Sequence, residues 1–222
     1  MARDRLKLMS LLTLRACPGL AGLLASVFPD RPDAEYGQAR WDAEYDVGGW
    51  SHLAGAQEAA RNQVIASLQA RLRPGAQVLD VGCGEGVLAR TLLPGRYRSY
   101  LGIDLSSVAV ARAAERATPP MRFEVADGAT FHTDERFDVI AFNESLYYFD
   151  QPVEAAERYA TLLASDGVLL VSMALCGMRD GLRKLAIWRA LKARFRTMDE
   201  IELVRRPMPV WLIGAFGGGE GD

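Results

Sequence analysis

Four polar features of this sequence occupy equivalent places, each directly after a short apolar run. They are a glycine-rich turn beginning at Gly82, the carboxylates of Asp104 and Asp127, and the amide of Asn143. If the apolar runs are parallel strands, their carboxyl ends share one edge of a sheet, and ligands of such sheets bind at that edge. Carboxylates there accept hydrogen bonds from ligand hydroxyls and amines. The spacing therefore predicts a site for a small ligand that carries a ribose.

The glycine-rich turn lies within the sequence VLDVGCGEG at residues 78–86. Gly82, Gly84 and Gly86 allow a sharp turn and let a ligand approach the backbone, because no Cβ is in the way. The apolar run before the turn and the helical pattern at 87–93 form the first half of a nucleotide-binding βαβ unit. The spacing is G-x-G-x-G, which differs from the G-x-G-x-x-G of dinucleotide sites.

The acidic residues near this edge each have a candidate role and an ordinary alternative. We expect Asp104 to accept hydrogen bonds from both ribose hydroxyls and Leu105 to lie against a purine ring. Asp127 is a candidate acceptor for an exocyclic adenine amine, although Asp127-Gly128 is also a common turn. Asp80 either serves a ligand ammonium, directly or through water, or bonds the backbone N–H groups of the glycine turn.

The elements that would position these residues alternate between strand-like runs and helical patterns. This alternation predicts an α/β fold with a parallel sheet covered on both faces. Two apolar runs at 201–206 and 210–216 predict an antiparallel pair at the end of that sheet. The expected strands are 78–81, 98–104, 122–126, 137–142 and 168–173, and the expected helices are 54–72, 87–93, 108–117, 152–163 and 182–195.

The composition divides the chain into three parts: an N-terminal helical or lid segment at 1–53, a main domain at 54–216 and a flexible tail at 217–222. Residues 1–30 are apolar and basic, and we favour a helical lid packed on the domain. The alternatives are a basic amphipathic helix that contacts a membrane surface through residues 1–28, and disorder of the first few residues. Arg15 and Pro18 interrupt the apolar stretch, which argues against a signal peptide or a membrane span.

The bulk properties are those of an ordinary soluble domain. The chain has 222 residues, 50% of them hydrophobic and 24% charged, which is enough for a full core. The net charge of −2 gives no general attraction to nucleic acid. Cys17, Cys83 and Cys176 are too few and too far apart for a disulfide framework or a zinc site. We therefore expect no metal and a cytoplasmic location, and the oligomeric state is open.

Several motifs in register resemble those of the class I S-adenosylmethionine-dependent methyltransferases. They are residues 78–86, 102–106, 126–127 and 137–140. The resemblance covers roughly residues 75–175. It implies a doubly wound, Rossmann-like sheet of seven strands that is mostly parallel, with the last strand antiparallel. The N-terminal segment would then be a helical cap.

The resemblance also implies S-adenosyl-L-methionine as the cofactor and a place for each part of it. Cys83, within the glycine turn, is expected to pack there and not to act as a nucleophile. The cofactor's methionine portion would lie among Gly82, Gly84, Gly86 and Asn143, its ribose at Asp104, and its adenine at Ala126 and Asp127. The expected cofactor-binding set also includes Asp80, Cys83, Leu105 and Gly128.

Residues 143–148, Asn-Glu-Ser-Leu-Tyr-Tyr, look like the bacterial small-molecule branch of that family, which includes sugar-modifying and nodulation-type N-methyltransferases. They do not match the Asn/Asp-Pro-Pro-aromatic motif of nucleic-acid amino methyltransferases. Trp41, Gly49 and Trp50 resemble the substrate cap of bacterial enzymes found with sugar-modifying genes. The expected reaction is in-line transfer of a methyl group to an oxygen or nitrogen of a small molecule, such as a sugar or specialised metabolite.

Candidate acceptor-side residues follow the expected strand at 137–142 or belong to an N-terminal aromatic patch at residues 36–52. A base assists a hydroxyl acceptor, whereas a neutral amine needs less help. The catalytic candidates are Glu144, Tyr147 and His52, and the substrate-binding candidates are Tyr36, Trp41, Tyr45, Trp50 and Tyr148. Two other classes of function are open. An NAD-type oxidoreductase is disfavoured by the glycine spacing, and a non-catalytic cofactor-binding protein would differ by its lack of methyl transfer.

Overall fold

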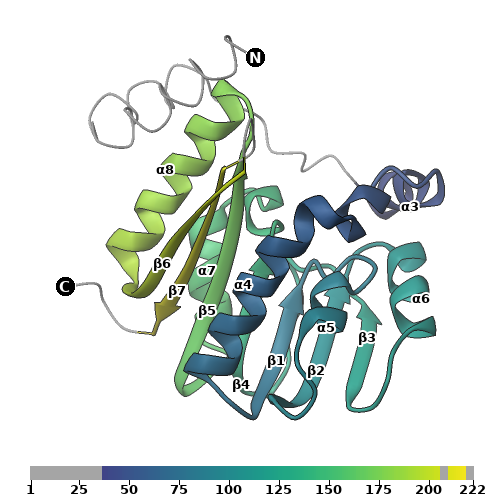
Figure 1. The fold of residues 1–222 in the computed structure, drawn as a ribbon, viewed down its shortest axis with the longest axis horizontal. Helices are drawn as coiled ribbons and strands as arrows, with labels where there is room; N and C mark the ends of the chain where they lie inside the picture. The colour runs from purple at the N-terminus through teal and green to yellow at the C-terminus, as the bar shows by residue number, and fades with distance from the viewer. Residues whose placement is uncertain (1–36, 206–209, 219–222) are drawn as a thin grey trace.

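The computed structural model describes residues 37–205 and 210–218, which form one sheet with helices on both faces (Figure 1). Tyr36, the lid expected at 1–30 and most of the tail lie outside the described residues. The strands are Ala76–Val81 (β1), Tyr97–Asp104 (β2), Met121–Val125 (β3), Phe137–Asn143 (β4), Leu163–Leu175 (β5), Arg196–Val204 (β6) and Val210–Gly217 (β7). The helices are Gln38–Asp46 (α3), Ala56–Leu72 (α4), Val87–Thr91 (α5), Ser107–Glu115 (α6), Pro152–Ala160 (α7) and Met178–Arg194 (α8), with 3₁₀ turns at Ser51–Ala54 (η1) and Leu146–Tyr148 (η2).

The sheet has seven strands in the order β3-β2-β1-β4-β5-β7-β6. Strands β1 to β5 pair in parallel, and β7 pairs antiparallel with both β5 and β6. This confirms the doubly wound, mostly parallel sheet that the sequence predicts. The register sets Asp104 beside Val125 and Asn143 beside Ser172, so the polar strand ends meet at one edge.

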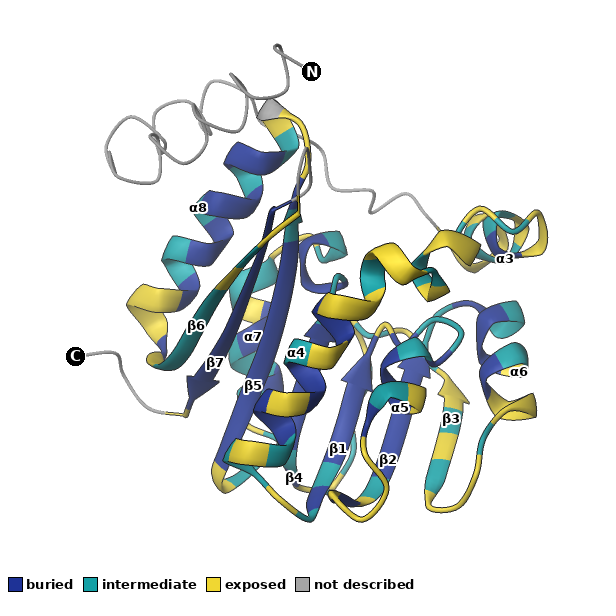
Figure 2. Ribbon diagram, viewed as in Figure 1, coloured by how far each residue is buried: buried dark blue, intermediate teal, exposed yellow. Residues whose placement is uncertain are grey.

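Two apolar clusters fill the space between the sheet and the helices on either side of it. On one face Ile65 and Leu68 of α4 and Leu88 of α5 pack against the strands. On the other face Tyr159 of α7 and Trp188 of α8 do the same. The central strands are buried on both faces (Figure 2), which is why they read as continuous apolar runs. No helix in the described part of the chain is long and apolar enough to cross a membrane.

Two strands, β5 and β6, begin several residues earlier than the sequence patterns predict. β5 begins at Leu163, because Leu163 pairs with Phe137 of β4, and α7 is correspondingly shorter. β6 begins at Arg196, which pairs with Gly217 of β7. Polar side chains alternate along β6 because it is an edge strand, so a search for apolar runs finds only its second half.

Candidate active site

Three glycines with positive φ form the turn after β1: Gly82 at 74°, Gly84 at 52° and Gly86 at 71°. Glycine adopts this conformation without the steric cost of a side chain. At Gly82 there is a second requirement, because a Cβ there would lie 2.5 Å from the Cβ of Ser145. Gly86 caps α5, and a Cβ there would lie 3.1 Å from the ring of Phe123. Gly86 therefore serves packing, and it lines neither of the cavities described below.

Asp104, at the end of β2, is turned towards the glycine turn. Its Oδ2 accepts the N–H of Gly84 at 2.8 Å, and its Oδ1 accepts the N–H of Ser106 at 2.9 Å. Burial raises the pKa of Asp104, and these two backbone hydrogen bonds oppose that shift. Each carboxylate oxygen can still accept another hydrogen bond. The side chain therefore lies beside the glycine turn with acceptor capacity to spare.

The larger of two adjoining cavities begins at Asp104 and has a volume of about 500 Å³. Asp127 contributes to its wall, but Asp127 Oδ1 also accepts the N–H of Ala129 at 2.8 Å. The structure therefore contains the ordinary turn at Asp127-Gly128, which is the alternative to a ligand contact at this residue. Four further candidates line the larger cavity, namely Leu105, Ala126, Asp127 and Gly128.

The smaller cavity, of about 290 Å³, lies next to the larger one. Gly82, Trp41, Ser145 and Tyr148 line both cavities, so the two are parts of one cleft. The fold thus brings the N-terminal aromatic patch and the segment after β4 to one place. The remaining candidates that line the smaller cavity are Tyr45, Trp50, His52, Cys83, Gly84, Asn143, Glu144 and Tyr147.

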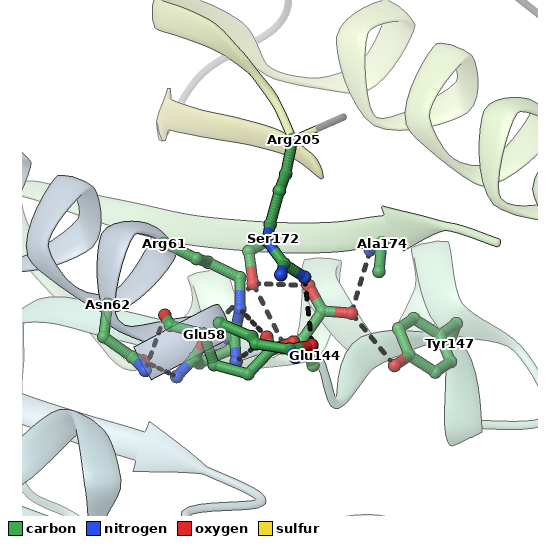
Figure 3. A network of polar contacts seen from close by, with 10 residues as sticks. Glu58, Arg61, Asn62, Glu144, Tyr147, Ser172, Ala174 and Arg205 are labelled. Atoms are coloured by element: carbon green, nitrogen blue, oxygen red, sulfur yellow. Dashed lines mark hydrogen bonds and ion pairs between the residues drawn. The ribbon is translucent and has the colours of Figure 1, made fainter. Parts of the chain in front are cut away.

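Asn143, at the end of β4, is held by two side chains of α4, Arg61 and Asn62, which are labelled in Figure 3. Arg61 Nη1 donates to Asn143 Oδ1, and Asn143 Nδ2 donates to Asn62 Oδ1 at 2.9 Å. Arg61 also forms an ion pair with Glu58, with Nη2 and Oε2 3.0 Å apart. Sequence reasoning did not find Arg61 or Asn62, which are 2% and 1% exposed. Their signal is the polar set at 58, 61 and 62, which shares one face of a helix that packs on the sheet.

Glu144 has a φ of 63°, the one positive φ among the described non-glycine residues. Such a conformation costs about 1–3 kcal/mol, so the surroundings must hold it in place. Glu144 Oε2 accepts the N–H of Ala174 at 2.8 Å and the hydroxyl of Tyr147 at 3.1 Å. Glu144 Oε1 lies 2.9 Å from the hydroxyl of Ser172. Both carboxylate oxygens are therefore fixed at the wall of the smaller cavity.

Tyr147 is buried beneath Glu144. Burial raises the pKa of Tyr147, and the neighbouring Glu144 carboxylate adds to the shift, so the phenol keeps its proton and donates it. The Nζ of Lys184 lies 3.8 Å from the centre of the Tyr147 ring. Lys184 is itself buried, donates to the carbonyl oxygen of Ala174 at 3.1 Å, and pairs with Asp180 at 2.8 Å. Sequence reasoning did not find Lys184.

His52 lies on η1, exposed at the rim of the smaller cavity. Its Nδ1 is 3.1 Å from the carbonyl oxygen of Gly49. A carbonyl oxygen only accepts hydrogen bonds, so Nδ1 carries the hydrogen and Nε2 of the neutral ring keeps its lone pair. The indole of Trp50 lies beside the imidazole, with ring centroids 6.0 Å apart.

Asp80 lies under the glycine turn and lines neither cavity. It is 1% exposed, and its Oδ2 accepts the hydroxyl of Tyr100 at 2.5 Å. Its Oδ1 is buried without a partner among the described residues. Burial raises the pKa of Asp80 to about 7, against the effect of the Tyr100 hydrogen bond. Burial likewise raises the pKa of the Cys83 thiol, so Cys83 lines the smaller cavity as a thiol and not as a thiolate.

Comparison with protein families gives a match to a family described as "Methyltransferase domain", over residues 53–203. Among curated proteins, an uncharacterized methyltransferase of Mycobacterium tuberculosis is 33% identical over 116 residues, which are 51% of this chain and 58% of that protein. Nocamycin O-methyltransferase of Saccharothrix syringae is 37% identical over 105 residues, 43% of this chain and 36% of that protein. The matches therefore span only about a third to 58% of the length of these relatives.

Solved structures share the fold at low sequence identity. The N-methyltransferase NodS of Bradyrhizobium japonicum, in complex with S-adenosyl-L-homocysteine, has a TM-score of 0.66 at 20% identity, over 77% of this chain and 92% of that one. The 1,6-didemethyltoxoflavin-N1-methyltransferase of Burkholderia thailandensis has a TM-score of 0.63 at 22% identity, over 83% of this chain and 87% of that one.

The strand order, the glycine turn and the carboxylate at the end of β2 together define a class I methyltransferase fold. The match over residues 53–203 covers more than half of the chain. The chain therefore belongs to the methyltransferase-domain family, among the class I S-adenosylmethionine-dependent methyltransferases. This confirms the resemblance that the sequence motifs carry.

Proposed function

We propose that this chain transfers a methyl group from S-adenosyl-L-methionine to an oxygen or nitrogen of a small molecule in the cytoplasm. The observation that carries the proposal is the two-part cleft at the carboxyl edge of the sheet. Its larger cavity contains Asp104, and its smaller cavity contains Glu144. Gly82 and the aromatic pair Trp41 and Tyr148 belong to both. One part suits a nucleoside and the other suits an acceptor.

The residues of the larger cavity fit the adenosine half of the cofactor. Asp104 has acceptor capacity for ribose hydroxyls, Leu105 offers an apolar surface to a purine, and Asp127 offers an acceptor to an amine. The volume of about 500 Å³ lies within the range of about 300–1,000 Å³ that is usual for small-molecule sites. The unpartnered Oδ1 of Asp80 lines neither cavity, and it adds an acceptor under the glycine turn for a water that bridges to a ligand ammonium.

S-adenosyl-L-methionine bound there would supply a methyl group already activated by a sulfonium. The remaining task of the chain is to orient an acceptor and to exclude water. Orientation alone supplies up to about 7–11 kcal/mol in favourable cases. Trp41, Tyr147 and Tyr148 form rigid walls for this purpose. Glu144, fixed by its three donors, is placed to accept a hydrogen bond from the acceptor and thereby to align it.

Two features bear on whether oxygen or nitrogen is methylated. The free Nε2 of His52 is a base at the rim of the smaller cavity, and a base favours a hydroxyl acceptor. The named relatives include an O-methyltransferase, whereas the similar solved structures include N-methyltransferases. His52→Asn separates the two cases. It should lower the rate for a hydroxyl acceptor and leave the rate on a neutral amine largely unchanged.

Isothermal titration calorimetry tests the cofactor half of the proposal. We expect S-adenosyl-L-homocysteine to bind the wild-type chain and Asp104→Ala to weaken that binding strongly. Asp138→Ala, which removes an aspartate at the opposite end of the sheet, is the matched control. Binding of NAD in place of S-adenosyl-L-homocysteine would point to an oxidoreductase and overturn the proposal.

Transfer of radiolabelled methyl groups to a panel of sugars, phenols, amines and carboxylic acids tests the catalytic half. Any labelled product that Glu144→Gln reduces supports the proposal. Tight binding of S-adenosyl-L-homocysteine without any transfer would favour a non-catalytic cofactor-binding protein.

A further inference from the structure

Helix α3 lies outside the α/β core and contributes to both cavities. Gln38 and Trp41 line the larger cavity, and Trp41 and Tyr45 line the smaller one. In Figure 1, α3 lies beyond the carboxyl ends of β1, β2 and β3, next to α6. The cofactor cavity is therefore covered on one side by a helix that is not part of the sheet architecture. What holds α3 there decides how readily the cavity opens.

One side chain of α3 makes a concentrated set of contacts with α6. Asp42 Oδ1 accepts the hydroxyl of Ser106 at 2.7 Å and the N–H of Val108 at 3.3 Å. Asp42 Oδ2 accepts the hydroxyl of Ser107 at 3.1 Å. The carboxylate thus occupies the N-terminus of α6, where free N–H groups and the helix dipole favour a negative charge. These contacts lower the pKa of Asp42, chiefly through the Ser106 hydroxyl, so the carboxylate is ionised at neutral pH.

The segment 106–108, which binds Asp42, also connects Asp42 with the cofactor site. The backbone N–H of Ser106 donates to Asp104 Oδ1 at 2.9 Å, while its hydroxyl donates to Asp42. Ser106 therefore joins the carboxylate of the cap to the carboxylate expected to hold the ribose. Trp41, the residue before Asp42, forms a wall of both cavities. Fixing Asp42 on α6 thus also fixes Trp41 over the cleft.

Arg112 of α6 makes a second contact with α3, and its ion pair with Asp46 is the weaker part of that contact. Arg112 of α6 donates to the carbonyl oxygen of Tyr45 at 2.7 Å and to Glu85 of the glycine turn at 3.0 Å. Its contact with Asp46 is longer, at 3.7 Å, and the Asp46 side chain is 67% exposed. An exposed ion pair of this kind contributes little. Asp46 is therefore the natural comparison for Asp42, since both are aspartates of α3 that face cationic or donor groups of α6.

We propose that Asp42 is a positioning residue that fastens α3 over the cofactor cavity, and that release of its contact with the N-terminus of α6 is the step that lets the cofactor in and out. The inference rests on the proposed function for the identity of the ligand. The contact itself belongs to the chain alone. Asp42 acts through Trp41 and Ser106 and does not touch the reacting atoms.

Stopped-flow displacement of S-adenosyl-L-homocysteine provides the first test. Asp42→Ala is expected to raise the dissociation rate constant about tenfold, equivalent to about 1.4 kcal/mol, because the closed arrangement loses its hydrogen bonds. Asp42→Asn, which keeps acceptor capacity but loses the charge, should lie between Asp42→Ala and wild type. Asp46→Ala should change the rate less than twofold.

Hydrogen exchange of the cofactor-free protein provides the second test and needs no ligand. In Asp42→Ala the amides of α3 and the amide of Val108 should exchange faster, while those of β1, β4 and β5 keep their wild-type protection. Faster exchange throughout the sheet would show that Asp42 merely supports global stability, and it would overturn the proposal.

The two hypotheses fail in different ways. If wild-type protein does not bind S-adenosyl-L-homocysteine, the proposed function fails and the release step fails with it. If wild-type protein binds and Asp42→Ala releases the ligand at the wild-type rate, the positioning role of Asp42 fails alone.

Discussion

The indole of Trp41 meets the ring of Tyr148 edge to face, with centroids 5.1 Å apart and planes at 89°. Trp41 belongs to α3 and Tyr148 to the segment after β4, so this contact joins the cap to the core. Both side chains line both cavities. An aromatic pair of this geometry contributes about 0.5–1.5 kcal/mol beyond its buried area. The pair is therefore well suited to separate the larger cavity from the smaller one.

Trp41→Ala removes that partition, and we expect it to weaken binding of S-adenosyl-L-homocysteine by about tenfold, in line with the loss of one aromatic contact and its buried area. Trp41→Phe keeps a ring against Tyr148 and should remain within about threefold of wild type. Calorimetric titration of both variants measures the effect. Equal affinities for Trp41→Ala and wild type would show that the indole does not form part of the binding wall.

A comparison of Gly75, just before β1, with Gly82 of the glycine turn separates the cost of backbone strain from the cost of steric conflict. Gly75 and Gly82 have nearly the same φ, 72° and 74°, but a Cβ at Gly75 meets nothing within 4 Å, whereas at Gly82 it lies 2.5 Å from Ser145. Gly75→Ala should lower the free energy of unfolding by about 1 kcal/mol, from backbone strain alone. Gly82→Ala should lower it by about 3 kcal/mol, because overpacking is added. Urea denaturation measures both, and equal losses would contradict the steric argument.

The buried carboxyl of Asp80 predicts a pH dependence of stability. Burial raises its pKa from 3.8 to about 7, so the folded state disfavours the ionised form. A raised carboxyl pKa makes stability highest below the unfolded-state value and lowers it as the pH rises towards the folded-state value. Asp80→Asn does not ionise. Between about pH 5 and about pH 7 its free energy of unfolding should therefore rise, relative to wild type, by about 2 kcal/mol.

Urea denaturation at the two pH values measures this difference. Tyr100→Phe is the companion variant, because it removes the hydrogen bond that partly offsets the effect of burial. It should make the loss of wild-type stability with rising pH steeper. A difference between Asp80→Asn and wild type that is the same at both pH values would contradict the assignment of the titration to Asp80.

The sequence predicts the parts of this site that depend on local chain geometry. The turn at Gly82 and the carboxylate of Asp104 follow buried strands directly, so their place at the sheet edge follows from parallel pairing. Arg61 and Asp42 were missed because both belong to helices rich in charged residues, where a charged side chain ordinarily faces water. Their partners, Asn143 and Ser106, are distant in the sequence. Only the packing of α4 and α3 against the sheet edge makes these contacts, and no short-range pattern encodes that packing.

The buried pair of Arg61 and Glu58 gives a final prediction, in which stability and ligand binding respond differently. Arg61→Met leaves the Glu58 carboxylate without its partner, and the Glu58 side chain is only 15% exposed. The free energy of unfolding should therefore fall by about 3 kcal/mol. Adding Glu58→Met should restore much of that loss, because an apolar pair replaces an uncompensated charge. Denaturant midpoints of the single and double variants measure the recovery.

Binding of S-adenosyl-L-homocysteine should not recover in the double variant. Both variants lack the guanidinium that donates to Asn143 Oδ1, so the amide at the end of β4 loses its orientation in each. We expect the two variants to bind the ligand equally weakly in calorimetric titration although their stabilities differ. Recovery of affinity together with stability would instead mean that Arg61 acts only through the fold, and that Asn62 is enough to hold Asn143 in place.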